Sequence, residues 1–243
     1  RERIPELRQH NTIYDGRFPI PTFQEIVDLT KRLSRELHRR IGIYPETKHP
    51  TYFRSIGLPL EERLVAALRA NKLNRRNARV FVQSFETANL RLLRRLLRVP
   101  LIQLLGPPGT RPYDFTATGD TRTYADLATP AGLRGIAGYA DGIGPPKESI
   151  VPRDAAGRSL ARTSLVSDAH AAGLLVHPYT FRNENAFLPL ELRSGSDPAA
   201  YGNALAEDAQ FFGLGVDGLF TDNPDTAVEA RGRAARSAIG WRG

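Results

Sequence analysis

Short apolar runs alternate with helical patterns along most of the chain, and this alternation limits the fold more than any other feature. Six runs have the composition of buried strands: 41–46, 79–85, 100–105, 140–144, 174–178 and 216–220. Helical patterns occupy 22–40, 60–70, 86–98, 130–138, 159–172 and 199–212, and a last one begins after Pro224. Strands separated by helices pair in parallel through right-handed crossovers. The sequence therefore predicts an α/β fold.

Six strand–helix units with one leading helix fit two architectures, an open doubly wound sheet or a (β/α)8 barrel whose first two strands precede Arg1. A barrel gathers the carboxyl ends of all its strands in one mouth, whereas an open sheet concentrates its site at one switch point. We therefore expect a TIM (β/α)8 barrel with six of eight units visible, residues 1–243 forming a single partial domain. The polar residues expected at these strand ends are Glu46, Lys48, Gln83, Asp141, His177, Tyr179, Thr221 and Asp222.

Composition excludes several classes of protein. The 243 residues are 41% hydrophobic and 25% charged, enough for a globular α/β core. No run of about 18 apolar residues occurs, so no transmembrane helix is expected, and the opening Arg-Glu-Arg-Ile is not a signal peptide. The absence of cysteine excludes disulfides and thiolate metal sites.

The net charge of +8 comes mainly from arginine. In the densest cluster, at 90–98, Leu90, Leu93 and Leu97 share one helical stripe and the arginines fall largely outside it. This pattern is typical of an amphipathic surface helix. Without aromatic interleaving or a recognition motif, we expect no nucleic-acid partner, although the positive field would help an anionic small substrate.

The stretch Ile41-Gly-Ile-Tyr-Pro-Glu-Thr-Lys-His-Pro50 carries the strongest chemical signal. Its apolar run suits a buried strand that Pro45 and Pro50 end, which places Glu46 and Lys48 at the carboxyl end. Period-two alternation then puts both side chains on one face. A solvated surface ion pair is the simple interpretation. A metal or phosphate role is the alternative, because function often lies at such strand ends.

Six motifs in chain order resemble the glycerophosphodiester phosphodiesterase family, in particular its bacterial periplasmic branch. They are Arg17-Phe-Pro-Ile-Pro-Thr-Phe-Gln-Glu25, Gly42-Ile-Tyr-Pro-Glu-Thr-Lys48, Val82-Gln-Ser-Phe85, Tyr139-Ala-Asp-Gly-Ile-Gly-Pro145, Val176-His-Pro-Tyr-Thr-Phe-Arg182 and Gly218-Leu-Phe-Thr-Asp-Asn-Pro-Asp225. The resemblance implies a TIM barrel that hydrolyses glycerophosphodiesters to an alcohol and glycerol 3-phosphate. It also implies a divalent metal, Ca²⁺ or alternatively Mg²⁺, and a periplasmic or secreted location.

By this resemblance, Glu46 is a metal ligand and Lys48 neutralises the substrate phosphate. Both assignments agree with physical chemistry, because hard cations take carboxylate oxygens and an ammonium stabilises phosphate charge. The residues expected to line the substrate pocket are Gln83, His177, Tyr179 and Phe220.

The family's Glu-x-Asp and His-Asp motifs are missing from the sequence, and its one His-Arg pair, His38-Arg39, lies in a predicted helix rather than at the end of a first strand. We therefore expect its general acid and base histidines and two further metal carboxylates to lie upstream, so no catalytic residue is visible here and the chain alone should be impaired or inactive. Of the five histidines, only His177 is expected at a strand end.

Two other functions remain open. One is a non-catalytic module that binds phosphate-bearing ligands on the same fold. The other is an aldolase-like barrel with Lys48 as Schiff-base nucleophile, which Glu46 disfavours by holding the ammonium protonated. The leaving head group and the oligomeric state are not determined by the sequence.

Overall fold

The computed structural model describes residues 1–239, and this part of the chain forms two compact units. The first unit contains Arg1–Ile20, Pro145–Val166 and the chain from Val176 onward, and the second contains Pro21–Gly144 and Ser167–Leu175. Each unit is described by itself. No helix of the described residues is long and apolar enough to cross a membrane.

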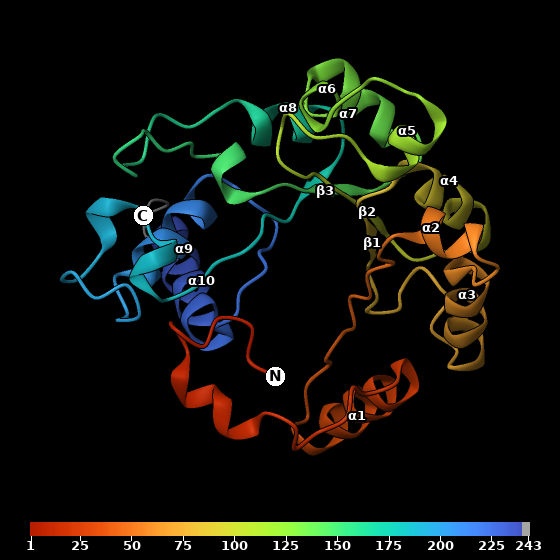
Figure 1. Ribbon diagram of the computed structural model, residues 1–243, viewed down its shortest axis with the longest axis horizontal. Helices are drawn as coiled ribbons and strands as arrows, with labels where there is room; N and C mark the ends of the chain where they lie inside the picture. Colours follow the sequence, from red (N-terminus) through yellow and green to blue (C-terminus); the bar gives the residue numbers. More distant parts are fainter. Residues whose placement is uncertain (240–243) are drawn as a thin grey trace. The chain divides into compact units, whose positions relative to one another are not determined.

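The second unit is built on a parallel sheet, as the alternating pattern predicts (Figure 1). Strand β1 (Val82–Ser84) pairs in parallel with β2 (Leu101–Leu104), and β2 pairs in parallel with β3 (Gly142–Gly144). Strand β4 (Leu175–Val176) follows in the sheet order, with Leu175 N–H donating to the Asp141 carbonyl. The strands are shorter than the apolar runs that predicted them.

Helices pack against this sheet through leucine-rich faces. Helix α4 (Thr87–Leu96) contacts β1 and β2, and α3 (Leu60–Ala70) packs against α4. Leu90, Leu93 and Leu97 are buried, which confirms the predicted stripe. Each fully buried leucine contributes about 1.5–3 kcal/mol. The other helices of this unit are α2 (Pro50–Ser55), α5 (Tyr113–Thr118), α6 (Tyr124–Leu127) and α7 (Pro130–Ala137).

Helix α1 (Phe23–Glu36) begins at the predicted capping box, in which Thr22 and Glu25 bond each other's backbone N–H groups. It ends before Arg40 because His38 adopts a left-handed conformation, with φ 48°. Val27 is its one buried residue. Helical periodicity thus predicts this helix without predicting how deeply it is buried.

The expected strand at 41–46 is an extended segment with two isolated parallel bridges, Ile43 to Val80 and Glu46 to Gln83. Ile43 N–H donates to the Arg79 carbonyl and Thr47 N–H to the Gln83 carbonyl, both at 3.0 Å. Between them stands Pro45, which has no N–H to donate. The ladder is interrupted at the proline, so the run does not form a regular strand.

The first unit contains α9 (Ala204–Gly213) packed against α10 (Pro224–Ile239), with the short turns η1 (Gln9–Tyr14), η2 (Lys147–Ser149), η3 (Asn185–Phe187) and η4 (Leu190–Leu192). Segment 176–181 runs beside 217–222, with Asp217 N–H on the Val176 carbonyl and Phe220 N–H on the Pro178 carbonyl. The expected strand at 216–220 is therefore extended but irregular. Pro178 has no N–H to donate to the neighbouring segment. Between the two hydrogen bonds, the segment 217–220 has one more residue than 176–178, so the pairing contains a bulge.

Two helical regions differ from the prediction. The helix expected at 159–172 is the shorter α8 (Leu165–Ala171), which begins later because the Thr163 hydroxyl accepts the Leu165 N–H. The segment 106–129, for which no helix was predicted, contains α5 and α6. Thr123 and Asp126 form a capping box at the start of α6, a local signal that could have predicted it.

Candidate active site

A cavity of about 330 Å³ opens beyond the carboxyl ends of β1 and the 41–46 segment, within the second unit. We call it the Glu46 cavity. Glu46 and Lys48 both line it, as expected from their alternation along the extended chain. The remaining lining residues are Thr47, His49, Ser84, Phe85, Glu86, Gly106, Pro107, Thr110, Arg111, Tyr113 and Tyr124.

Glu46 and Lys48 form an ion pair, with 3.4 Å between Lys48 Nζ and Glu46 Oε2. The Glu46 side chain is 18% exposed, whereas that of Lys48 is 73% exposed. An exposed pair of this kind contributes only about 0–1 kcal/mol to stability. The ammonium can therefore leave the carboxylate for an incoming anion at little cost.

Thr47 also lines the cavity, and its buried hydroxyl anchors the segment. Its hydroxyl donates to Asn89 Oδ1 at 2.7 Å, and Asn89 Nδ2 donates to Glu61 Oε1 at 2.8 Å. Glu61 is 3% exposed and also accepts from Arg54 at 2.9 Å. This buried chain of hydrogen bonds holds the segment that carries Glu46 and Lys48.

His49 also lines the cavity, although the sequence indicated only His177 as a histidine at a strand end. Its ring packs edge-on against Tyr113 at 5.8 Å between centroids. Its backbone is left-handed, with φ 50°, which is uncommon for a residue with a side chain. Its place between Lys48 and Pro50, after the same apolar run, was the available signal.

Glu86 is a second carboxylate in the cavity that sequence analysis missed. It is 2% exposed and accepts the Thr51 N–H at 3.0 Å. Burial raises the pKa of the Glu86 carboxyl, and the Thr51 hydrogen bonds partly oppose that rise. Glu86 immediately precedes α4, where the sequence gives no indication that it faces Glu46.

Gln83 lies beside Glu46, because the two residues form a parallel bridge. Its side chain is 7% exposed, and Oε1 has no hydrogen-bond partner in the described part of the chain. A buried amide oxygen without a partner costs about 1–3 kcal/mol. Gln83 is not among the residues that line the Glu46 cavity, so it is placed beside this site only through its backbone bridge to Glu46.

The other three expected site residues lie together in the first unit. His177 and Tyr179 follow β4, and Phe220 lies on the neighbouring segment, with its N–H on the Pro178 carbonyl at 2.9 Å. Tyr179 is held on its other side, where its N–H donates to Pro145 and its carbonyl accepts from Lys147.

His177 is 7% exposed, and burial lowers its pKa, while the Asp217 carboxylate partly opposes that decrease. A Cβ on Gly218 would lie 3.2 Å from the imidazole Cδ2, so this glycine leaves room for the ring. The imidazole therefore favours its neutral form, which can accept or donate a hydrogen bond.

Asp141 is not at a carboxyl end, contrary to the sequence prediction. It immediately precedes β3, pairs with Arg94 and accepts the Leu101 N–H at 2.7 Å. Its role is to join α4 to the sheet. At the other end of the chain, Asp222 pairs with Arg8 at 3.0 Å and Arg182 at 2.8 Å, all within the first unit.

A divalent cation does not find a complete ligand set in the described residues. Within residues 1–239, no three His, Asp or Glu side chains are grouped so that they could hold a metal ion. Ca²⁺ takes about six to eight oxygen ligands, several of them anionic. Glu46 can supply one carboxylate and Glu86 already accepts a backbone N–H, so further ligands would be needed.

Comparisons with known proteins agree with the six motifs. The model of the glycerophosphoryl diester phosphodiesterase family matches residues 1–226. Glycerophosphodiester phosphodiesterase GDPD6 of Arabidopsis thaliana is 36% identical over 223 residues, covering 86% of this chain and 55% of the relative. A glycerophosphodiester phosphodiesterase of Treponema pallidum is 28% identical over 251 residues, covering 94% and 66%. The chain thus spans less than two thirds of these relatives.

Solved structures agree on the fold. A putative glycerophosphoryl diester phosphodiesterase from Silicibacter pomeroyi superposes with a TM-score of 0.57 at 18% identity, covering 87% of this chain and 56% of that one. One from Agrobacterium tumefaciens gives a TM-score of 0.51 at 18% identity, covering 86% and 64%. At such identity the likeness establishes the fold alone, which is the expected α/β TIM-barrel class.

Proposed function

Because this chain belongs to the glycerophosphoryl diester phosphodiesterase family, we propose that its protein hydrolyses glycerophosphodiesters to an alcohol and glycerol 3-phosphate. The observation that carries the proposal is the Glu46–Lys48 pair, which lines one cavity and lies on either side of Thr47, whose hydroxyl is anchored by Asn89. In this proposal Lys48 neutralises the substrate phosphate. The proposal also gives a role in substrate binding to Gln83, beside Glu46, and to His177, Tyr179 and Phe220 of the first unit.

The test is the steady-state kinetics of Lys48→Ala with glycerophosphocholine, in an assay coupled to release of glycerol 3-phosphate. Loss of a preorganised charge at the reacting phosphate should lower kcat/KM by about 100-fold or more. Arg134→Ala is the matched control, because it removes one exposed cation from α7 in the same unit. Lys48→Ala activity within a few-fold of wild type would refute the phosphate role.

We further propose that the reaction uses a divalent metal, Ca²⁺ or alternatively Mg²⁺, with Glu46 as one ligand. Because residues 1–239 do not supply the rest, the proposal needs other carboxylates, and acid and base histidines, from outside this part of the protein. It is supported by the absence of the family's Glu-x-Asp and His-Asp motifs from the sequence. Residues 1–243 alone should then show little turnover compared with the whole protein.

A binding module without turnover is the second candidate, and the cavity lining favours it. Lys48 and Arg111 carry positive charge there and would attract a phosphate whether or not hydrolysis follows. Titration calorimetry of glycerophosphocholine separates the two functions. Binding that Lys48→Ala weakens, without release of glycerol 3-phosphate by the whole protein, would establish the module.

Domain organisation and location complete the proposal. We propose that both units belong to one catalytic domain, since one family model runs through residues of both. A periplasmic or secreted location is proposed from the resemblance of the motifs to the bacterial branch. The relatives do not single out that branch, because the plant protein from Arabidopsis is 36% identical and the bacterial protein from Treponema is 28% identical. Cell fractionation with an antibody tests the location.

A further inference from the structure

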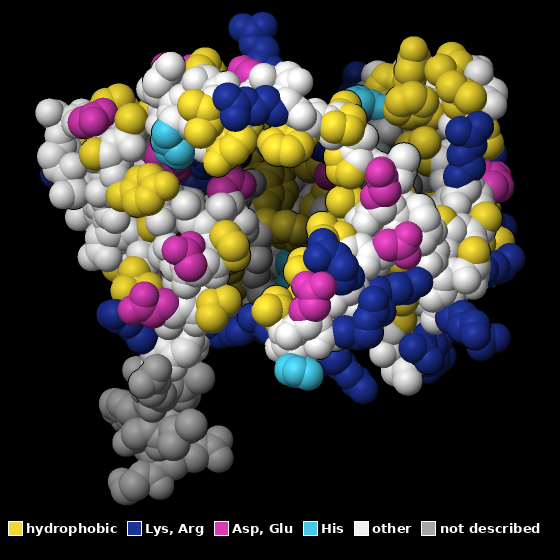
Figure 2. All heavy atoms as spheres, turned by 90° about the horizontal axis from the view of Figure 1, so that it is seen from below, with side chains coloured by type: hydrophobic (Ala, Val, Ile, Leu, Met, Phe, Trp, Pro, Cys, Tyr) yellow, Lys and Arg dark blue, Asp and Glu magenta, His cyan; other side chains and the backbone are white. Residues whose placement is uncertain are grey.

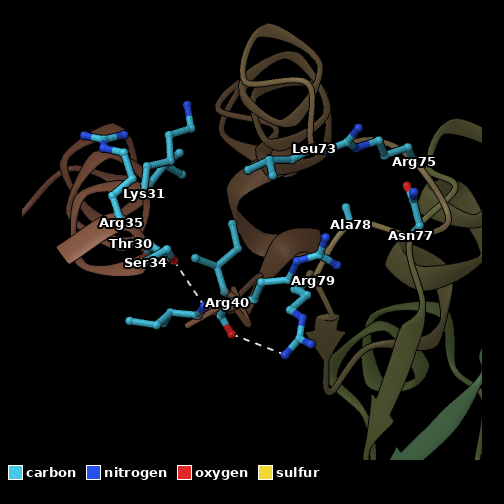
Figure 3. Close-up of a pocket in the computed structure, with 13 residues that line it drawn as sticks. Thr30, Lys31, Ser34, Arg35, Arg40, Leu73, Arg75, Asn77, Ala78 and Arg79 are labelled. Carbon is cyan, nitrogen blue, oxygen red and sulfur yellow. Dashed lines mark hydrogen bonds between the residues drawn. The ribbon is translucent and has the colours of Figure 1, made fainter. Parts of the chain in front are cut away.

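Two hollows lie at the amino-terminal ends of the second unit's strands, away from the Glu46 cavity. The first, of about 460 Å³, lies between α1 and the segments that precede Val80 (Figure 3). The second, of about 560 Å³, lies between the ends of α3 and α4. Arg75 lines both. We call their combined lining the basic surface.

Nine different cations line the basic surface, and no carboxylate lines either hollow. In Figure 2, Lys and Arg side chains gather toward the lower right, with few Asp or Glu among them. The cations of the first hollow are Lys31, Arg35, Arg40, Arg75 and Arg79, and those of the second are Arg69, Lys72, Arg75, Arg95 and Arg98.

None of these nine cations belongs to the ion pairs found in the described part of the chain. Elsewhere, by contrast, Arg8, Arg54, Arg94, Arg122 and Arg153 each pair with a carboxylate. Exposed cations elsewhere, such as Arg63 and Arg134, also lack an ion pair in the described residues, so what distinguishes this surface is the gathering of nine unpaired cations around two hollows that share Arg75. Like charges held together without counterions repel, so this arrangement costs stability.

Neutral partners hold several of these cations in place. Lys31 Nζ donates to Asn71 Oδ1 at 2.6 Å, and Arg79 donates to the Arg40 carbonyl at 3.2 Å. Arg69 donates to the Leu96 carbonyl at 3.5 Å. Amide and carbonyl oxygens orient the side chains without cancelling their charge, which prepares them for an anion.

Favourable helix dipoles explain part of the surface. Arg35, Arg69 and Arg95 lie in the last turns of α1, α3 and α4, where cations are stabilised. Arg40, Arg75 and Arg79 lie outside these helices, so the dipole does not account for them. Figure 3 shows Lys31 and Arg35 on α1, and Arg75 and Arg79 on a separate loop that lines the same hollow.

We propose that the basic surface binds an anion that carries several phosphate groups. One phosphate has at most about two charges near pH 7, far fewer than this set of cations can neutralise. Arginine forks suit phosphate oxygens, and no aromatic side chain lines either hollow for stacking against nucleic-acid bases. The phosphates could belong to a free polyphosphorylated molecule or to anionic lipid headgroups. This proposal is independent of the proposed hydrolysis.

The probe is tripolyphosphate, measured by titration calorimetry on the full-length protein, with inorganic phosphate beside it. Tripolyphosphate should bind at least tenfold more tightly than phosphate, and its affinity should fall steeply with added NaCl. Arg40→Glu and Arg75→Glu should each weaken binding at least tenfold. Arg134→Glu makes the same charge change on α7, outside both hollows, and should leave the affinity within twofold.

Lys48→Ala distinguishes the two sites, because it alters the Glu46 cavity alone and should not change tripolyphosphate binding. Arg40→Gln and Arg75→Gln remove the charge without reversing it, which is less disruptive to folding. They should also weaken tripolyphosphate binding, but by less than the Glu variants. Flotation with phosphatidylglycerol and phosphatidylcholine vesicles identifies the source of the phosphates. Binding to phosphatidylglycerol alone, lost in Arg75→Glu, assigns lipid headgroups, and tripolyphosphate binding without flotation assigns a free ligand. Equal affinities for all variants, or no binding of either probe, would overturn the proposal.

Discussion

The two ends of the same parallel sheet differ in the charged residues that line them. At the carboxyl end, the Glu46 cavity mixes carboxylates with cations, and Glu46 pairs with Lys48 at 3.4 Å. At the amino end, the basic surface has cations alone, held by neutral oxygens. A mixed site can hold a proton or a metal as well as an anion, whereas an all-cationic site can only attract negative charge. Composition alone, with its net charge of +8, does not separate these roles.

The largest expected difference between the two ends of the sheet is in hydrolytic activity. Glu46→Gln removes the carboxylate that the proposed function assigns to the metal, so kcat/KM should fall by about 100-fold or more. Arg40→Gln removes one charge from the basic surface and should leave kcat/KM within twofold. Parallel steady-state assays of the two variants decide the point. Similar losses in both would show that the two ends act as one site.

Stability should reveal the hydrogen bonds that anchor Thr47. Asn89→Leu removes both bonds of a buried amide, so Thr47 loses its acceptor and Glu61 loses a donor. We expect the free energy of unfolding to drop by about 2–4 kcal/mol in urea titrations. Asn74→Leu, near the basic surface, is the control and should cost less, since Asn74 is more exposed. A loss below about 1 kcal/mol for Asn89→Leu would mean that Asn89 does not anchor Thr47.

The pH dependence of stability should contain a contribution from Glu86. Its pKa in the folded chain is raised above the ordinary 4.5, so the folded state binds the proton more tightly than the unfolded chain. Stability contributed by the protonated form is therefore lost as pH rises from 4.5 through the raised pKa. Glu86→Gln should remove that loss when urea titrations at about pH 4 and about pH 8 are compared.

Glu62→Gln is the control for that measurement. A hydrogen bond from Arg54 lowers the pKa of Glu62, so its contribution has the opposite sign and is lost as pH falls. An unchanged pH slope in Glu86→Gln would contradict the burial argument.

The smallest effect concerns repulsion within the basic surface. Arg75→Gln should raise the free energy of unfolding by about 0.5 kcal/mol at low salt, because Arg75 lines both hollows without an ion pair. The gain should vanish in high salt, which screens these charges. Thermal melts at two NaCl concentrations measure it, with Arg134→Gln as control. Destabilisation by Arg75→Gln at low salt would mean that the cation has a structural partner.

The sequence by itself determined the features that depend on neighbouring residues. Period-two alternation placed Glu46 and Lys48 on one face, and helical periodicity identified Leu90 and Leu93 as buried. The tertiary structure alone decided which distant residues meet. Glu86 lines the same cavity as Glu46 because a parallel crossover brings 83 beside 46, and the basic surface gathers cations from positions 31 to 98. Periodicity depends only on neighbouring residues. Which side chains from distant segments meet depends on how the crossovers order the strands in the sheet, and no single segment determines that order.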